Sequence, residues 1–152
     1  MKKLGLVTLI AFAILVFAPA GTRAQGGARQ GPEVVRDADM EKDSLHNLEV
    51  ARQYFKLRKA YKASLARCEE IIAGNPTFSK IDEVLLIAGV SSLRLSENKG
   101  KQSVKTTTDK LREDARDYLS MVVNNYPDSR FKDEALEDLK ALGGPRPKDG
   151  KP

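Results

Sequence analysis

The sequence predicts an all-α protein, built from antiparallel helical hairpins that stack as a short solenoid of about two and a half units. The main observation is an internal repeat with an offset of 51 residues (127 − 76). In the second copy, Pro76, Asp82, Glu83 and Leu85 return as Pro127, Asp133, Glu134 and Leu136, and Ser64, Cys68, Ile71 and Ile72 as Ala115, Leu119, Val122 and Val123. Apolar residues at helical spacing and a proline after each unit are the other two observations. Because a repeated helical hairpin buries its apolar face against its neighbours, we expect a stack that binds another molecule.

Residues 1–24 have the layout of a secretory signal peptide. Two lysines precede an apolar run over 4–17, and small residues follow that run. The run is shorter than the roughly 20 apolar residues that a membrane-spanning helix needs, so we expect cleavage after Ala20 or after Ala24. Export of the remaining chain predicts a periplasmic location.

Charge and cysteine content argue against several classes of partner. The chain has 26 basic and 21 acidic residues, and three of the basic ones lie within residues 1–24. Acidic and basic residues alternate over 112–117, which is typical of a solvated helix face rather than of a nucleic-acid surface. The single cysteine, Cys68, permits no internal disulfide, and residues 15–29 lack the cysteine that a lipoprotein would acylate. We therefore expect no nucleic-acid partner and no lipid anchor.

Composition divides the rest of the chain into three segments. Residues 25–38 contain three glycines and a proline among polar neighbours, which predicts a flexible linker. Residues 39–142 carry the helical patterns and are expected to form the folded domain. Residues 143–152 contain three of the seven prolines, and we expect a disordered tail.

The first hairpin is predicted from two apolar stripes. Five residues, mostly three or four positions apart, form the stripe of its first helix: Leu45, Leu48, Ala51, Phe55 and Leu57. A second stripe of the same spacing runs over 60–72, with a turn expected near Arg58 and Lys59. Gly74 and Pro76 should end the second helix, because glycine accepts a left-handed conformation and proline has no N–H to donate.

Three further helices are expected after that stop. The third begins near Ser79, whose hydroxyl group is placed to cap it, and a polar stretch without periodicity follows at 96–108. Thr106 is placed to cap the fourth helix, which ends before Pro127. A fifth helix over 128–142 is expected to cover the end of the stack.

These hairpins resemble the tetratricopeptide repeat, in which small residues lie where the two helices cross and a proline closes each unit. The family's positions fall on Leu48, Ala51, Arg52, Phe55, Ser64, Cys68, Ile71 and Pro76, and then on Leu85, Ala88, Gly89, Ala115, Leu119, Val122 and Pro127. Arg52 stands where the family has glycine, and the second unit has about 14 extra residues between its helices. The resemblance implies a right-handed solenoid whose first and third helices line a groove.

Within this superfamily, the runs at 51–55, 60–67 and 126–129 resemble the BamD family of outer-membrane β-barrel assembly factors. The resemblance covers residues 39–142, which correspond to about half of that family's usual number of repeats. It implies a non-catalytic periplasmic protein that binds barrel-assembly subunits or unfolded outer-membrane proteins, at the periphery of the outer membrane. The alternative is an envelope-organising tetratricopeptide adaptor that coordinates cell-wall synthesis or division.

The same resemblance places a partner-binding groove on exposed positions of the first and third helices. These positions are His46, Glu49, Gln53, Lys56, Leu86, Val90, Leu93 and Arg94. Leu86, Val90 and Leu93 are expected either to grip an apolar partner residue or to pack against a neighbouring helix or a second copy. Lys56 and Arg94 are expected to attract an acidic group.

The sequence predicts no catalytic, metal or cofactor site. It contains no glycine-rich phosphate loop, zinc-ligand spacing or nucleophile elbow, and Cys68 and His46 fall in different expected helices. We expect Cys68 to be a buried apolar residue rather than a reactive thiol, and His46 to be an ordinary surface residue. The lysine-rich stretch 99–105 is expected to be a solvated connector rather than a contact for anionic lipid.

Overall fold

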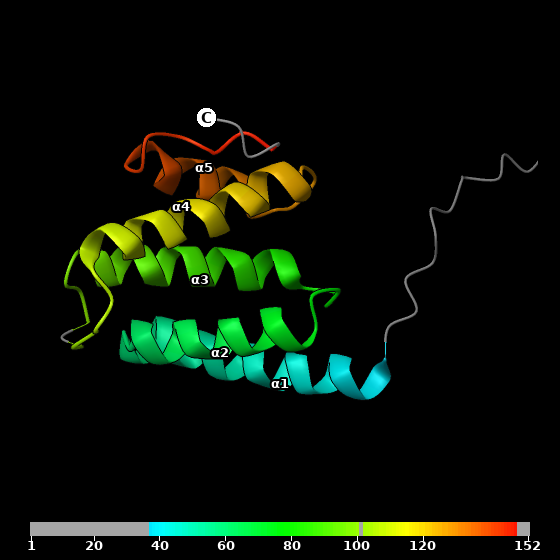
Figure 1. The fold of residues 1–152 in the computed structure, drawn as a ribbon. Helices are drawn as coiled ribbons and strands as arrows, with labels where there is room; N and C mark the ends of the chain where they lie inside the picture. The colour runs from blue at the N-terminus through cyan, green and yellow to red at the C-terminus, as the bar shows by residue number, and fades with distance from the viewer. Residues whose placement is uncertain (1–36, 101, 149–152) are drawn as a thin grey trace, which may run out of the picture. The chain divides into compact units, whose positions relative to one another are not determined.

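The computed structural model of the protein describes residues 37–100 and 102–148, and these two ranges contain helices and turns but no strand (Figure 1). The prediction of an all-α protein is confirmed. The elements are α1 (Ala38–Gln53), a single turn of π-helix η1 (Tyr54–Arg58), α2 (Tyr61–Gly74), α3 (Ile81–Ser96), α4 (Thr108–Asn125) and α5 (Lys132–Lys140). None of these helices is long and apolar enough to cross a membrane. The predicted signal peptide and all but the last two residues of the predicted linker lie outside the described residues.

The helices pack side by side in sequence order, from α1 to α5 (Figure 1). Helices α1 and α2 form one antiparallel hairpin, and α3 and α4 form a second one. Helix α2 packs on α3 and so joins the two hairpins, while α1 also touches α3 and α5 packs on α4. Each element therefore contacts mainly its neighbours in the chain, as in a stack of helical hairpins.

Helix α3 is the most deeply buried element. Of its 16 residues, only Asp82 and Arg94 are not buried. A helix that is apolar on every side has to be covered on every side, and the hairpin partner α4 and the preceding helix α2 both pack on α3. The main hydrophobic cluster joins α3 residues to Leu48 of α1, Cys68 of α2, Leu119 of α4 and Leu139 of α5.

Small residues let the two helices of each hairpin approach closely. In the first hairpin, Ser64 is fully buried and its hydroxyl group donates a hydrogen bond of 3.0 Å to the carbonyl oxygen of Ala51. In the second hairpin, a Cβ atom built on Gly89 would lie 2.6 Å from Cγ of Leu119 and 3.3 Å from the carbonyl oxygen of Ala115. Gly89 therefore allows an approach that no larger residue permits.

The sequence repeat is also a repeat of backbone conformation. After α2, the backbone N–H groups of Asn75, Phe78 and Ile81 donate to the carbonyl oxygens of Ile71, Asn75 and Phe78. After α4, those of Tyr126, Ser129 and Lys132 donate to Val122, Tyr126 and Ser129, which are the same positions shifted by the repeat offset. The φ and ψ angles also agree, at −141° and 73° for Asn75 and −128° and 63° for Tyr126.

The helix starts differ in detail from the predicted ones. Helix α3 begins after Lys80 without a side-chain cap, so Ser79 does not have the expected role. Thr107 rather than Thr106 caps α4, by accepting a hydrogen bond from the backbone of Lys110. Helix α5 is shorter than expected at its start, because residues 128–131 form the repeated turn.

Both ends of the described region are more ordered than expected. Helix α1 begins at Ala38, inside the predicted linker, because the carboxylate of Asp37 accepts hydrogen bonds from the next turn. Residues 143–148, predicted as part of a disordered tail, lie along α4. Asn124 donates to the carbonyl oxygen of Arg146 at 2.8 Å, and the backbone N–H of Arg146 donates to Ser120 Oγ at 2.8 Å.

Substitution of Gly89 by alanine tests the close approach of α3 and α4. Alanine normally favours a helix over glycine by about 1 kcal/mol, but here the new methyl group meets Leu119 and Ala115 in the core. We expect Gly89→Ala to lower the free energy of unfolding by about 1–3 kcal/mol, measured by urea denaturation.

The matched control is Gly74→Ala at the exposed end of α2, where an added Cβ atom meets nothing within 4 Å. This variant should be neutral or more stable by up to about 1 kcal/mol. Equal effects of the two substitutions would contradict the described crossing of α3 and α4.

Candidate functional site

The apolar half of the expected groove is not exposed. Leu86, Val90 and Leu93 are only 5%, 4% and 2% exposed, respectively. Leu86 and Val90 belong to the same hydrophobic cluster as Ala135 and Leu139 of α5. Of the two expectations for these residues, the structure shows packing against neighbouring helices of the same chain, so they do not belong to an open groove.

The polar half of the expected groove lies on one face of α1 and η1. His46, Glu49, Gln53 and Lys56 are exposed, at spacings of three and four residues. Arg94, which was expected to attract a partner's acidic group, instead pairs with Glu97 at 3.1 Å and approaches Asp138 of α5 at 3.7 Å. Only the α1 part of the predicted site remains open to a partner.

An ion pair joins α1 to α3. Nε and Nη2 of Arg52 donate to the two carboxylate oxygens of Glu83 at 2.7 and 2.6 Å, while Arg130 lies 3.7 Å away. Burial alone would raise the pKa of Glu83, but the hydrogen bonds and charge of Arg52, with Arg130 and Lys80, hold that pKa below its ordinary value. A glycine at position 52 could not make this bidentate contact, which is the role that the structure gives Arg52.

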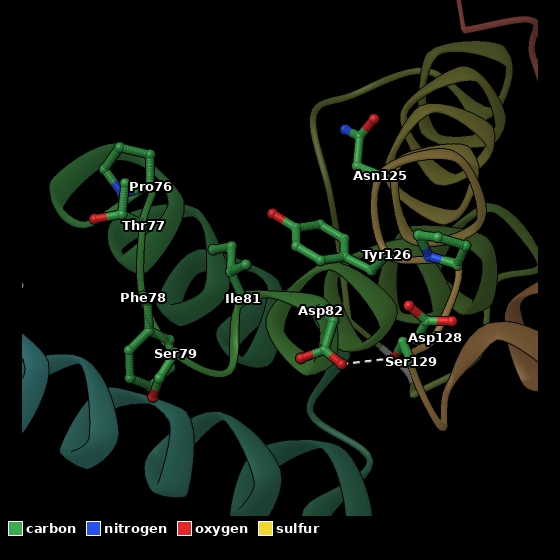
Figure 2. Close-up of a pocket in the computed structure, with 11 residues that line it drawn as sticks. Pro76, Thr77, Phe78, Ser79, Ile81, Asp82, Asn125, Tyr126, Asp128 and Ser129 are labelled. Carbon is green, nitrogen blue, oxygen red and sulfur yellow. Dashed lines mark hydrogen bonds between the residues drawn. The ribbon is translucent and has the colours of Figure 1, made fainter. Parts of the chain in front are cut away.

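A cleft of about 570 Å³ lies between the two proline turns (Figure 2). One wall is the turn between α2 and α3, and the other is the turn between α4 and α5. The residues that line it are Pro76, Thr77, Phe78, Ser79, Ile81, Asp82, Asn125, Tyr126, Pro127, Asp128 and Ser129. Because the repeat places the same backbone turn on both sides, the cleft is a direct product of the duplicated unit.

Figure 2 shows the ring of Tyr126 projecting across this cleft toward Pro76 and Thr77. Asp82, from the first turn of α3, accepts a hydrogen bond of 2.6 Å from the hydroxyl group of Ser129 and so links the two walls. Burial, and then the negative charge of Asp82, raise the pKa of Tyr126, whose hydroxyl group stays protonated. Ile81 lies between the walls and is only 7% exposed.

The cleft offers hydrogen-bond acceptors next to apolar surfaces. Its lining includes the carboxylates of Asp82 and Asp128 but no lysine or arginine. The rings of Pro76, Tyr126 and Pro127 offer flat apolar surfaces beside these carboxylates. The cleft is therefore suited to a peptide segment that carries apolar side chains together with a positively charged one.

The sequence analysis missed this cleft. Its residues were read only as helix stops and helix starts, although the repeated prolines and the Asp-Glu pair after each turn were already evident. The missing step was that two copies of one turn, separated by a single hairpin, come to lie next to each other.

The remaining candidates show no arrangement for chemistry. Cys68 is fully buried, and burial, followed by the charges of Glu69 and Glu83, raises its pKa to about 12. His46 is an exposed residue of α1. Over residues 37–100 and 102–148, no three histidine, cysteine or acidic side chains are placed to hold a metal ion.

Comparison of the chain with protein-family models found no match, and neither did comparison with curated proteins or with solved structures.

A double-mutant cycle on Arg52 and Glu83 tests the ion pair between α1 and α3. Each single alanine variant leaves a poorly solvated charge, so we expect a coupling free energy of about 2 kcal/mol. The exposed pair Arg67 and Glu70 on α2 is the control, with an expected coupling below about 0.5 kcal/mol.

The same pair predicts a pH effect. Because the folded pKa of Glu83 lies below its ordinary value of 4.5, its contribution is complete above pH 4.5 and is lost as the pH falls through the folded pKa. The difference in unfolding free energy between the protein and Glu83→Gln should shrink on acidification.

In the double-mutant cycle, a coupling free energy between Arg52 and Glu83 no larger than that between Arg67 and Glu70 would contradict the described contact.

Burial of Cys68 predicts a thiol that reacts only after unfolding. At pH 8 we expect modification by a thiol reagent to be at least about 100-fold slower in the native protein than in denaturant. Equal rates in the two states would place Cys68 on the surface and contradict the packing of α2 on α3.

Proposed function

We propose that this protein is a non-catalytic protein-binding module of the tetratricopeptide type, a right-handed solenoid of about two and a half units that acts in the periplasm. The helix order, the small residues at both helix crossings and the turn conformation repeated after α2 and α4 support this assignment. The layout of residues 1–24 as a signal peptide supports the location.

The observation that carries the proposal is the cleft between the two copies of the proline turn. It combines a protruding tyrosine, apolar ring faces and the carboxylates of Asp82 and Asp128 in a cavity of about 570 Å³. Concave sites with a few polar groups among apolar ones are the usual form of a binding site. The cleft, rather than the face of α3, is thus where we place the partner.

An extended peptide fits this arrangement. Successive side chains of a strand point to opposite sides, so one set contacts Tyr126 and Ile81 while the backbone or a cationic side chain reaches Asp82 and Asp128. Strands of outer-membrane β-barrels alternate apolar and polar residues in this way. Together with the resemblance to the BamD family, this chemistry supports a role in outer-membrane protein assembly, with an unfolded outer-membrane protein or a barrel-assembly subunit as partner.

Site-specific photo-crosslinking in the cell envelope tests the proposal. A photoreactive residue at Thr77, in the cleft, should crosslink to barrel-assembly subunits or to unfolded outer-membrane proteins. The same residue at Lys110, exposed at the start of α4, is the control and should give little of that product. Crosslinks to cell-wall enzymes would instead support the envelope-organising adaptor.

Charge reversal sharpens this experiment. Asp128→Lys removes an exposed carboxylate of the cleft, and we expect about tenfold less crosslinking from Thr77. Asp43→Lys, an exposed residue of α1, makes the same change in net charge away from the cleft and should have little effect. Equal crosslinking at Thr77 and Lys110, or no loss with Asp128→Lys, would refute the cleft as the binding site.

A further inference from the structure

The end of the hairpins opposite the cleft carries a concentrated positive charge. In Figure 1, η1 and the loop between α3 and α4 lie together at the left, whereas the turns that form the cleft lie at the right. We call this end the basic tip, and define it by Lys56, Leu57, Arg58, Lys59, Lys62 and Lys105.

Acidic residues are missing from both segments that form the basic tip. Residues 50–68 contain no aspartate or glutamate, and neither do residues 98–108. Glu97, which borders the second segment, already binds Lys99 at 2.8 Å and Arg94 at 3.1 Å. Glu69, which borders the first segment, lines one pocket with Lys62 and Lys105, but in the described part of the chain no ion pair joins a carboxylate to any cation of the tip.

Hydrogen bonds hold the loop against the start of α2. The backbone N–H of Lys62 donates to Oε1 of Gln102 at 2.8 Å, and its ammonium group donates to the carbonyl oxygen of Ser103 at 3.1 Å. Gly100, with φ of +83°, passes so close that an added Cβ atom would lie 2.4 Å from the carbonyl oxygen of Lys59. The two basic segments thus form one surface, whereas the sequence analysis considered only the stretch 99–105 and treated it as a solvated connector.

Leu57 projects from the middle of this charge. It is 80% exposed, compared with 45% for Met40 and 42% for Met121, the next most exposed large apolar side chains of the described residues. Lys56 and Arg58 flank it in the chain, and Lys59 follows with a φ of 51°. A left-handed conformation favours glycine or asparagine, so a lysine here keeps a positive charge at the tip against the local backbone preference.

We propose that the basic tip docks on the surface of an anionic lipid bilayer. Lysine and arginine at this surface are attracted by anionic head groups, and their flexible side chains reach the head groups while Leu57 enters the apolar boundary. A soluble polyanion would also attract the lysine and arginine side chains, but it has no apolar region for the exposed Leu57 to enter. The combination of both features selects the lipid surface.

This site is independent of the proposed function in the cleft. The two surfaces lie at opposite ends of the antiparallel hairpins (Figure 1), so a protein held at a bilayer through the tip keeps the cleft free for a partner. Loss of lipid binding would leave the crosslinking at Thr77 unaffected, and loss of crosslinking would leave lipid binding unaffected.

Co-sedimentation with vesicles tests the inference. The full-length protein should bind vesicles that contain phosphatidylglycerol more tightly than vesicles of phosphatidylcholine alone, and NaCl at about 0.5 M should weaken this binding. The apolar run in residues 1–24 can bind lipid by itself, so the decisive comparisons are between variants that share this N-terminus.

The first comparison reverses charge. Lys56→Glu, Arg58→Glu and Lys59→Glu together should reduce affinity for the anionic vesicles by at least about tenfold. The control, Lys42→Glu, Lys80→Glu and Lys148→Glu together, makes the same change in net charge at exposed positions outside the tip and should change affinity less than about twofold. Thermal unfolding of both variants near the temperature of the parent confirms that they are folded.

The second comparison removes the apolar contact. Leu57→Ser should weaken binding to anionic vesicles several-fold, whereas Met40→Ser, at the other end of α1, should not. Equal losses from the tip variant and the control variant would overturn the proposal. So would unchanged lipid binding by Leu57→Ser together with tight binding of a soluble polyanion such as heparin, which would identify a polyanion site instead.

Discussion

The nearly complete burial of α3 is the constraint on which the rest of the structure depends. This helix has no polar face, and only Asp82 and Arg94 are not buried. Water has to be excluded from every side of it, which requires neighbouring helices on every side. The order of the helices, the glycine at the crossing with α4 and the packing of α5 over the end of the stack all follow from this requirement.

The same constraint is the reason for placing both proposed binding sites at the ends of the hairpins rather than on the helix faces. The part of the predicted groove that lies on α3 is covered by other helices, and what remains exposed on α1 is a polar strip. The two ends differ in charge: carboxylates lie in the cleft between the proline turns, and uncompensated lysine and arginine residues lie at the basic tip. The two ends of the hairpins therefore carry opposite charge and differ in the groups that they can bind.

The sequence analysis predicted what depends on local patterns. Apolar spacing predicted the helices, and the repeated proline predicted where α2 and α4 end. The structure has the same backbone hydrogen bonds at both ends, beginning with those that the carbonyl oxygens of Ile71 and Val122 accept. The sequence analysis could not decide whether Leu86, Val90 and Leu93 contact a partner or a neighbouring helix, because the exposure of a helix face depends on which other helices cover it. The apolar residues on all sides of α3 were the available signal of burial. The order of residues 143–148 rests on side chains of α4 such as Asn124, which no local pattern reveals.

The most direct test of the central claim is amide hydrogen exchange along the chain. If α3 is covered on every side, its amides exchange only through global unfolding and are the slowest in the protein, while those of α1 and α5 exchange faster through local opening. Exchange in α3 as fast as in α1 or α5 would show that the helix is not enclosed, and would contradict both the fold described here and the placing of the proposed binding sites at the ends of the hairpins.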